Sequence, residues 1–238
     1  MSLIQLEVNL PGPGTLALAG SGEYLPAMQP VDRWLLEQLT VPARVVTLAT
    51  AAGTEGPERL QYWDELGVQH FTSLGVDSVQ ALPVIDRRSA EDERLADLIC
   101  QANFVYLSGG KPGYIYQTLA GSRAWAAICS VLTQGGVVAG CSAGAMIFGE
   151  QIPGIRNLVQ MGPGFGFLPG AFIIPHFDEI PQLLRQGLRS LHPRLKMIGV
   201  EGFTALVCRQ AGCFLRGRGQ VSIHHGDTFL HYRQEDLF

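Results

Sequence analysis

A serine between two glycines, in the sequence GCSAG at residues 140–144, is the strongest chemical signal in the chain. The apolar run VVA at residues 137–139 precedes it, and the small residues that follow suit the start of a helix. A strand that turns sharply into a helix at G-x-S-x-G presents a nucleophilic serine. Ser142 would then lie at a helix N-terminus, where free N–H groups and the helix dipole stabilise developing negative charge. The pattern predicts that Ser142 is a nucleophile.

Cys141, directly before Ser142, is a rival nucleophile. If Cys141 stood at the centre of the turn, the two glycine positions would be filled by Ala139 and Ala143. The spacing therefore favours Ser142. We expect the Cys141 thiol to point into the core, where a thiolate does not form readily.

A serine nucleophile needs a base, and His176 is the best placed of the six histidines. It follows the apolar run AFIIP at residues 171–175, which reads as a strand. Functional groups gather at the carboxyl ends of the strands of a parallel sheet, so His176 is expected to meet Ser142 there. Its imidazole would accept the serine proton and return it to the leaving group.

A tetrahedral intermediate also needs hydrogen-bond donors. The N–H of Ala143, directly after the serine, is one expected donor, and the N–H of Gly110 is the other. Gly110 belongs to a Gly-Gly pair that ends an apolar run at residues 104–108, and glycines let the backbone approach a substrate oxygen closely. Gly109 and Lys111, on either side of Gly110, are expected to contact substrate. Lys111 would meet a substrate carboxylate, the alternative being a solvated surface position.

Alternating strand-like and helix-like segments must position these groups. Strands are expected at residues 15–20, 44–50, 68–71, 104–108 and 137–139. Helices are expected at residues 29–39, 55–66, 89–101 and 123–133, with Gly67 as the stop of the second and Ser89 as the N-cap of the third. The alternation indicates βαβ units, and hence an α/β fold with a mainly parallel sheet flanked by helices.

The C-terminal part of the chain changes character. Short strand-like runs separated by glycine-containing turns occur at residues 197–200, 204–208, 213–216, 221–224 and 228–232. They predict antiparallel hairpins added to the edge of the sheet. No repeat or linker interrupts the chain, so one domain over residues 1–238 is the simplest organisation.

Composition excludes several classes of protein. Hydrophobic residues make up 47% of the chain and charged residues 16%, which favours a sizeable core over disorder. The net charge is −4 and no basic stripe is present, so nucleic acid is not an expected partner. No apolar run reaches the ~18 residues of a membrane span, and the N-terminus lacks a signal-like core. Five cysteines without a CxxC pair indicate reduced thiols and a cytoplasmic protein.

No cofactor or metal is expected. The sequence GSGE at residues 20–23 resembles half of a dinucleotide fingerprint, but it lacks the third glycine. Histidines 224, 225 and 231 lie in the hairpin region and indicate a solvated sheet edge rather than a metal cluster.

Several stretches together resemble one family. They are LAGSGE at 18–23, YLSGG at 106–110, GCSAGA at 140–145, GFGFLP at 164–169, PHF at 175–177 and GVEGFTAL at 199–206. In this order they resemble the dipeptidase E/cyanophycinase family of serine peptidases, whose fold is related to class I glutamine amidotransferases. The resemblance implies that Ser142 is the nucleophile, that His176 is the catalytic histidine and that the Gly-Gly loop supplies oxyanion contacts.

The sequence departs from the family pattern at the third member of the expected triad, the acid. The family has an acid between the serine and the histidine, in the stretch that reads PGIRN here, at residues 153–157. Glu150 is the one carboxylate between Ser142 and His176, so it is the expected orienting acid. The alternatives are that Asn157 orients the histidine or that the triad is broken and lacks its third member. Two further acids are held in reserve, Asp178 and Glu201.

The expected function is serine-dependent hydrolysis of small peptides through an acyl-enzyme, with aspartyl dipeptides as candidate substrates. The cyanophycinase branch has an arginine-rich stretch after its histidine, whereas residues 178–182 read DEIPQ here, which argues against an aspartyl-arginine polymer. The alternative is a catalytically impaired, amidotransferase-like protein that binds a small metabolite in the same pocket. A homodimer is the oligomer considered first, because two-fold dimers are the commonest.

Overall fold

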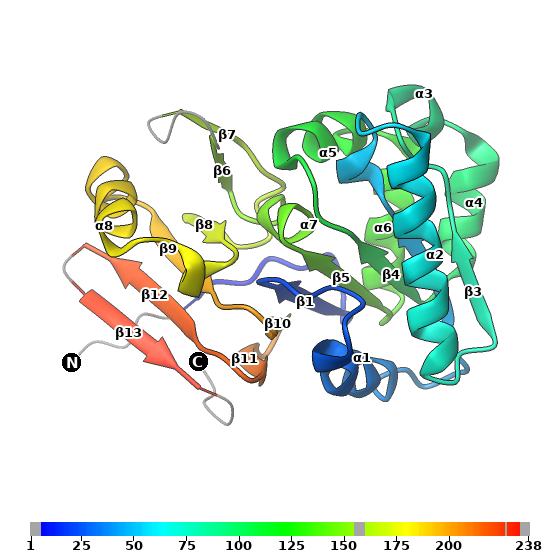
Figure 1. The fold of residues 1–238 in the computed structure, drawn as a ribbon, viewed down its shortest axis with the longest axis horizontal. Coiled ribbons are helices and arrows are strands. Elements are labelled where there is room, and N and C mark those ends of the chain that lie inside the picture. The colour runs from blue at the N-terminus through cyan, green and yellow to red at the C-terminus, as the bar shows by residue number, and fades with distance from the viewer. Residues whose placement is uncertain (1–5, 155–159, 227, 234–238) are drawn as a thin grey trace.

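The structure is a computed structural model, and it describes residues 6–154, 160–226 and 228–233. Its largest sheet has seven strands in the order β11-β10-β1-β5-β4-β2-β3 (Figure 1). The bounds are β1 Thr15–Ala19, β2 Arg44–Leu48, β3 Ser78–Ala81, β4 Phe104–Leu107, β5 Val137–Cys141, β10 Thr204–Arg209 and β11 Gly212–Gly217. The strands β1 to β5 are parallel, and β10 and β11 extend the sheet antiparallel beside β1. The predicted α/β class with a mainly parallel sheet is confirmed.

Helices cover both faces of this sheet (Figure 1). Their bounds are α1 Gln29–Leu36, α2 Pro57–Ser73, α3 Arg87–Ala90, α4 Glu93–Gln101, α5 Pro112–Leu119, α6 Arg123–Thr133, α7 Ala143–Met146 and α8 Gln182–Leu191. Short 3₁₀ turns lie at Pro26–Met28, Thr50–Ala52 and Phe177–Glu179. Within the described part of the chain, none of the helices is long and apolar enough to span a membrane.

Strand β4 shows why the sequences of the central strands are unbroken runs of apolar residues. Phe104 and Tyr106 point to the face covered by α1 and α2, whereas Val105 and Leu107 point to the face covered by α4, α5 and α6. Successive side chains of a strand point to opposite faces, so a strand covered on both sides buries all of them.

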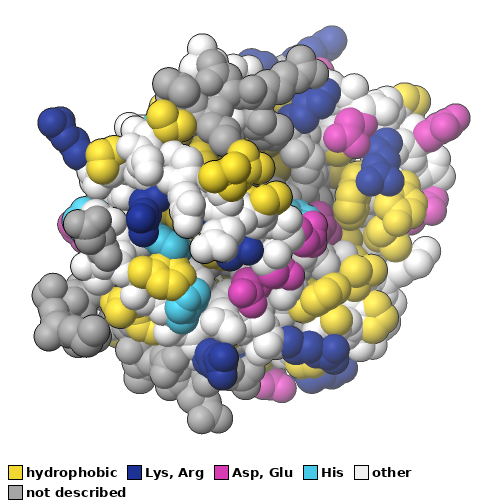
Figure 2. Space-filling model, turned by 60° about the vertical axis from the view of Figure 1, so that its left-hand side comes forward, with side chains coloured by type: hydrophobic (Ala, Val, Ile, Leu, Met, Phe, Trp, Pro, Cys, Tyr) yellow, Lys and Arg dark blue, Asp and Glu magenta, His cyan; other side chains and the backbone are white. Residues whose placement is uncertain are grey.

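A second sheet carries part of the C-terminal region. Its order is β13-β12-β9-β8, with β8 Ala171–Ile174, β9 Lys196–Val200, β12 Val221–His225 and β13 Thr228–Tyr232. In Figure 2, which brings the left-hand side of Figure 1 forward, histidine and Arg/Lys side chains lie among hydrophobic ones on this side of the molecule. A short ribbon of β6 (Gln151–Pro153) and β7 (Met161–Pro163) lies beside it.

Two expectations about local structure are wrong. Residues 68–71 are helical rather than a strand, because α2 continues through Gly67 to Ser73. A Cβ at Gly67 would lie 3.0 Å from the Thr47 side chain, so the glycine lets α2 pack closely on β2 rather than ending the helix. Ser89 is not an N-cap: the caps are Asp86 for α3, in a capping box with Ser89, and Asp92 for α4.

The placement of the C-terminal hairpins is also partly wrong. Strands β10 and β11 extend the edge of the main sheet as predicted, but β12 pairs with β9 in the second sheet, and β13 pairs with β12. The chain leaves the main sheet at Gly217, whose φ of 122° is poorly accessible to other residues. Buried Val221 and Ile223 of β12 then pack into the large core cluster that the second sheet shares with one face of the main sheet.

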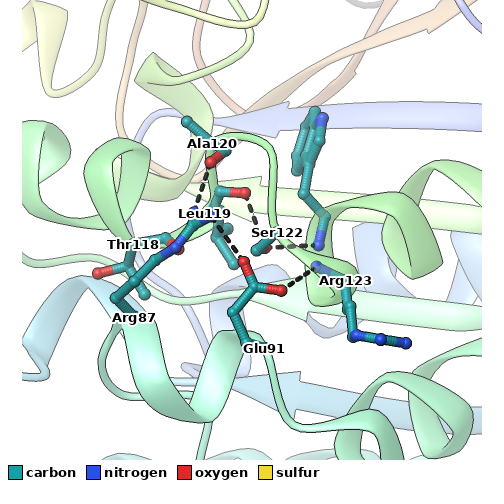
Figure 3. A network of polar contacts seen from close by, with 8 residues as sticks. Arg87, Glu91, Thr118, Leu119, Ala120, Ser122 and Arg123 are labelled. Carbon is teal, nitrogen blue, oxygen red and sulfur yellow. Dashed lines mark hydrogen bonds and ion pairs between the residues drawn. The ribbon is translucent and has the colours of Figure 1, made fainter.

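A polar network supports the helices near the C-terminal end of α5 (Figure 3). The Arg87 guanidinium of α3 donates to the Ala120 carbonyl at 2.5 Å and to the Glu91 carboxylate at 2.6 Å. Ser122 caps α6 and donates its hydroxyl to the Leu119 carbonyl at 2.7 Å. The network fixes the connection between α5 and α6, and α5 begins directly after the Gly-Gly loop.

Candidate active site

Ser142 occupies a strained turn between β5 and α7. Its φ and ψ are 51° and −116°, outside the region that side-chain-bearing residues favour. The turn is possible because a Cβ at Gly140 would collide with the Gly144 carbonyl, and a Cβ at Gly144 with the Leu107 carbonyl. The Ser142 N–H donates to the Ala19 carbonyl at 3.0 Å, which anchors the turn to β1. The predicted strand-turn-helix around Ser142 is present.

His176 follows β8 and reaches Ser142 from the second sheet. Its Nε2 lies 3.2 Å from the Ser142 Oγ, within hydrogen-bond distance. The residue adopts the left-handed conformation (φ 52°, ψ 35°), which turns the chain back toward the nucleophile. Its N–H donates to the Gly20 carbonyl at 3.3 Å, so the end of β1 ties both residues together. The pair was expected at the edge of one sheet, but it forms where two sheets meet.

Glu179 is the carboxylate beside the histidine. Its Oε1 lies 3.3 Å from His176 Nδ1, across the turn Phe177–Glu179. The side chains are 39% exposed for His176 and 65% exposed for Glu179, so water screens their attraction. The acid follows the histidine by three residues, whereas the family pattern has its acid before the histidine, and Glu179 was not among the acids that the sequence predicted. A carboxylate one turn after His176 is the feature of the sequence that could have identified Glu179 as its partner.

The expected role of Glu150 as the orienting acid is corrected by this contact. The Glu150 Oε2 instead accepts a hydrogen bond from the Gly170 N–H at 2.7 Å, because residue 150 leads out of the elbow toward β6. The reserve acids also serve elsewhere: Asp178 accepts from the Gly202 N–H at 2.8 Å, and Glu201 from the Gln220 N–H at 2.9 Å. Asn157, the alternative orienting residue, lies outside the described residues.

The Gly-Gly loop lies opposite the histidine. The Gly109 N–H donates to Glu23 Oε1 at 3.0 Å, so this amide does not face a substrate as expected. The N–H groups of Gly110 and Ala143, by contrast, have no hydrogen-bond partner among the described residues. Both residues line the cavity beside Ser142. This arrangement leaves two backbone donors available to an oxyanion.

Cys141 lies beneath the elbow. It is fully buried, and its Sγ lies 2.9 Å from Glu23 Oε2. Burial, reinforced by the neighbouring Glu23 charge, raises the pKa of the Cys141 thiol well above its ordinary value. A thiol held protonated under the sheet is a poor nucleophile, so the placement favours Ser142.

A cavity of about 440 Å³ opens beside Ser142 and His176. Most of its wall is apolar, and its described lining includes Met146, Ile174, Pro175, Ile180, Leu184 and Leu188. A second cavity of about 790 Å³ shares Pro112, Pro153 and Gly154 with it and is lined by Lys111. The Lys111 Nζ donates to Thr54 Oγ1 at 2.6 Å, on the rim of that cavity. The two cavities therefore adjoin each other beside the nucleophile, and together they are called the groove below.

The described residues contain no group of three or more His, Cys, Asp or Glu side chains arranged to hold a metal. The GSGE sequence at residues 20–23, which resembles half of a dinucleotide fingerprint, makes structural contacts in this protein. Its Glu23 carboxylate binds the Gly109 N–H and the Cys141 thiol beneath the elbow.

Two curated cyanophycinases are similar in sequence to this chain. The chain is 28% identical over 165 residues to the cyanophycinases of Synechococcus elongatus and Thermosynechococcus vestitus, which covers 64% of this chain and 51% of each of theirs. The chain thus spans about half the length of these curated relatives.

Two solved structures are also similar. A peptidase from an acI-B1 Actinobacterium matches with a TM-score of 0.84 and 32% identity, covering 94% of this chain and 96% of that one. A putative peptidase E from Listeria monocytogenes EGD-e shares the fold, with a TM-score of 0.62 and 18% identity over 87% of this chain and 99% of that one. The model of peptidase family S51 matches residues 16–214. The chain belongs to peptidase family S51.

Proposed function

We propose that this chain hydrolyses amide bonds of small peptides through an acyl-enzyme on Ser142. The observation that carries the proposal is the 3.2 Å approach of His176 Nε2 to the Ser142 Oγ. The serine lies at a strained elbow beside two backbone N–H groups that no described residue accepts from. A nucleophile, a base and oxyanion donors around one cavity are the parts that acyl transfer requires.

The reaction follows from these positions. The Ser142 Oγ attacks the substrate carbonyl carbon while His176 Nε2 takes its proton, and the N–H groups of Gly110 and Ala143 stabilise the oxyanion. His176 then passes the proton to the leaving amine, which departs as the acyl-enzyme forms. In the second half, His176 removes a proton from water, the resulting hydroxide attacks the ester, and the proton returns to Ser142. Glu179 orients the imidazole and stabilises its cation.

The groove indicates which peptides fit. The described wall beside Ser142 is mostly apolar and has no Lys or Arg, whereas Lys111 supplies a positive charge in the adjoining cavity. A short peptide can place its terminal carboxylate near Lys111 and its scissile carbonyl at Ser142. Aspartyl dipeptides remain candidates within this class.

An aspartyl-arginine polymer is the less favoured substrate, although two relatives are named cyanophycinase. Residues 178–182, directly after His176, contain two acids and no arginine. A side-by-side assay of aspartyl dipeptides and cyanophycin tests this preference. Faster cleavage of the polymer would contradict the assignment to short peptides.

Labelling with a fluorophosphonate tests the mechanism without knowledge of the substrate. An activated serine reacts covalently, and Ser142→Ala should abolish labelling while the fold persists, because only the nucleophilic oxygen is removed. Cys141→Ala is the matched control and should still be labelled. Absence of labelling in the natural protein would favour the alternative function, binding of a small metabolite without hydrolysis.

We also propose a cytoplasmic location. All five cysteines are free thiols in the structure, which supports the expectation drawn from their number and spacing. Detection of the protein in a fractionated culture of its source cells would test the assignment.

A further inference from the structure

A third cavity, of about 460 Å³, lies between α8 and the hairpin β12–β13, on the face that Figure 2 shows. Arg185 and Arg189, one helical turn apart on α8, line it from one side. His224 and His231 line it from the hairpin. The described lining contains no Asp or Glu, so this cavity concentrates positive and potentially positive side chains.

The two arginines lack carboxylate partners among the described residues. The Arg185 Nε donates to the Ile180 carbonyl at 2.7 Å, and its guanidinium lies 4.5 Å from the centre of the Phe177 ring. These contacts fix the side chain but leave its charge uncompensated. Arg189 makes no ion pair with a described acid, and it is close enough to His224 to lower that residue's pKa. Guanidinium groups held without a counter-ion favour an anionic ligand.

His224 supplies an independent observation. The residue is 9% exposed, and both ring nitrogens are buried without a hydrogen-bond partner in the described chain. Buried polar groups are nearly always satisfied, and an unsatisfied one costs free energy. The Phe229 ring lies 3.9 Å from the imidazole, and the Phe177 ring lies 5.8 Å from it. An acceptor in the cavity would relieve this cost.

We propose that this cavity binds a dianionic oxyanion of the phosphate class, either free phosphate or a phosphate monoester. Two guanidinium groups and the His231 imidazole line the same cavity and supply hydrogen-bond donors of the kind that phosphate oxygens accept. The Nδ1 of His231 is paired with Ser222 Oγ at 2.9 Å, which leaves its Nε2 for the ligand. The rings of Phe177 and Phe229 offer an apolar wall to the organic part of a monoester.

The cavity also adjoins the candidate active site. Phe177 directly follows His176, and the other side of α8 supplies Leu184 and Leu188 to the cavity beside Ser142. A bound anion would hold α8 and the histidine turn in place. This consequence rests on the proposed hydrolase function, whereas anion binding itself does not depend on it.

Calorimetric titration of the full chain with inorganic phosphate and with phenyl phosphate, at matched ionic strength in chloride, tests the site. Saturable binding is expected for both, and Arg185→Gln and Arg189→Gln should each weaken it by about tenfold or more, because hydrogen bonds to charged groups contribute most. Arg94→Gln, at an exposed position on α4, is the matched control and should bind as the natural protein does. Tighter binding of phenyl phosphate would identify a monoester as the ligand.

Histidine side-chain NMR on the natural protein gives a readout that needs no variant. Phosphate should shift the ring signals of His224 and His231 while those of His192 stay in place. The absence of saturable binding, equal weakening by Arg94→Gln, or tighter binding of succinate than of phosphate would overturn the proposal. Fluorophosphonate labelling of the natural protein in phosphate-free chloride buffer reports on Ser142 without the anion, so failure of the anion site is distinguishable from failure of the proposed hydrolase.

Discussion

Glu23 and Gly109 are joined by a 3.0 Å hydrogen bond that turns the Gly109 N–H away from the catalytic groove. The same carboxylate contacts the Cys141 thiol at 2.9 Å, so one side chain links the Gly-Gly loop to the strand that ends at the nucleophile. The next amide, that of Gly110, is left to face the groove. Glu23 therefore holds the loop that carries Gly110, the proposed oxyanion donor.

Glu23→Gln should lower kcat about tenfold with little change in KM, because a charge-assisted hydrogen bond is roughly twice as strong as a neutral one. The donor it positions matters most when the oxyanion forms. Steady-state kinetics on a dipeptide substrate would measure both constants. Cys141→Ala removes the other partner of Glu23 and should keep most of the activity. A fall in kcat as large as that of Glu23→Gln would assign the effect to the thiol contact instead.

Glu179→Gln should reduce kcat by only about two- to fivefold, because an exposed ion pair contributes less than about 1 kcal/mol. The carboxylate is 65% exposed and 3.3 Å from His176 Nδ1. Added salt should reduce the difference between the variant and the natural protein further.

Glu150→Gln provides the comparison for this prediction. Its carboxylate accepts the Gly170 N–H, so the variant should lose about 1 kcal/mol of unfolding free energy and keep its kcat. A strong loss of kcat in Glu150→Gln, with Glu179→Gln silent, would restore Glu150 to the triad.

The stability of the protein should depend on His224 in a defined pH window. Burial, with Arg189, His231 and Arg185 nearby, lowers the pKa of His224 to about 4 from 6.5. The unfolded chain therefore binds a proton between these values that the folded chain does not, and the contribution of His224 to stability falls as the pH drops from 6.5 to 4. Charges near the two cavity histidines come from Arg185, Arg189, Arg233 and Glu201.

Urea unfolding at pH 7 and pH 5 measures this dependence. His224→Phe should lose less unfolding free energy than the natural protein between the two pH values, because phenylalanine takes up no proton. Phosphate in the buffer should shrink the natural protein's loss, since a bound anion favours the charged imidazole. Identical pH dependence in the variant and the natural protein would show that His224 titrates normally.

The parts of the site that depend on local sequence could be predicted, and those that depend on packing could not. The strand and helix around Ser142 follow from a β-branched run and from glycines that a sharp turn needs. The contact with His176 depends on how the second sheet packs on the end of β1. The hydrophobic periodicity of the sequence does not predict that packing. Glu179 reaches the histidine because residue 176 has a positive φ, a conformation that the sequence does not predict for a residue other than glycine.

Lys111 tests the proposed orientation of the substrate. If its ammonium binds the terminal carboxylate of a short peptide, Lys111→Gln should raise KM about tenfold and leave kcat nearly unchanged, because the contact is the same in the ground and transition states. A C-terminally amidated peptide lacks that carboxylate, so its KM should respond little to the variant. Lys111 also donates to Thr54, and Thr54→Val serves as the control for that contact. Equal effects of Lys111→Gln on the acid and the amide would show that the lysine is structural, and the carboxylate would then have to bind elsewhere in the groove.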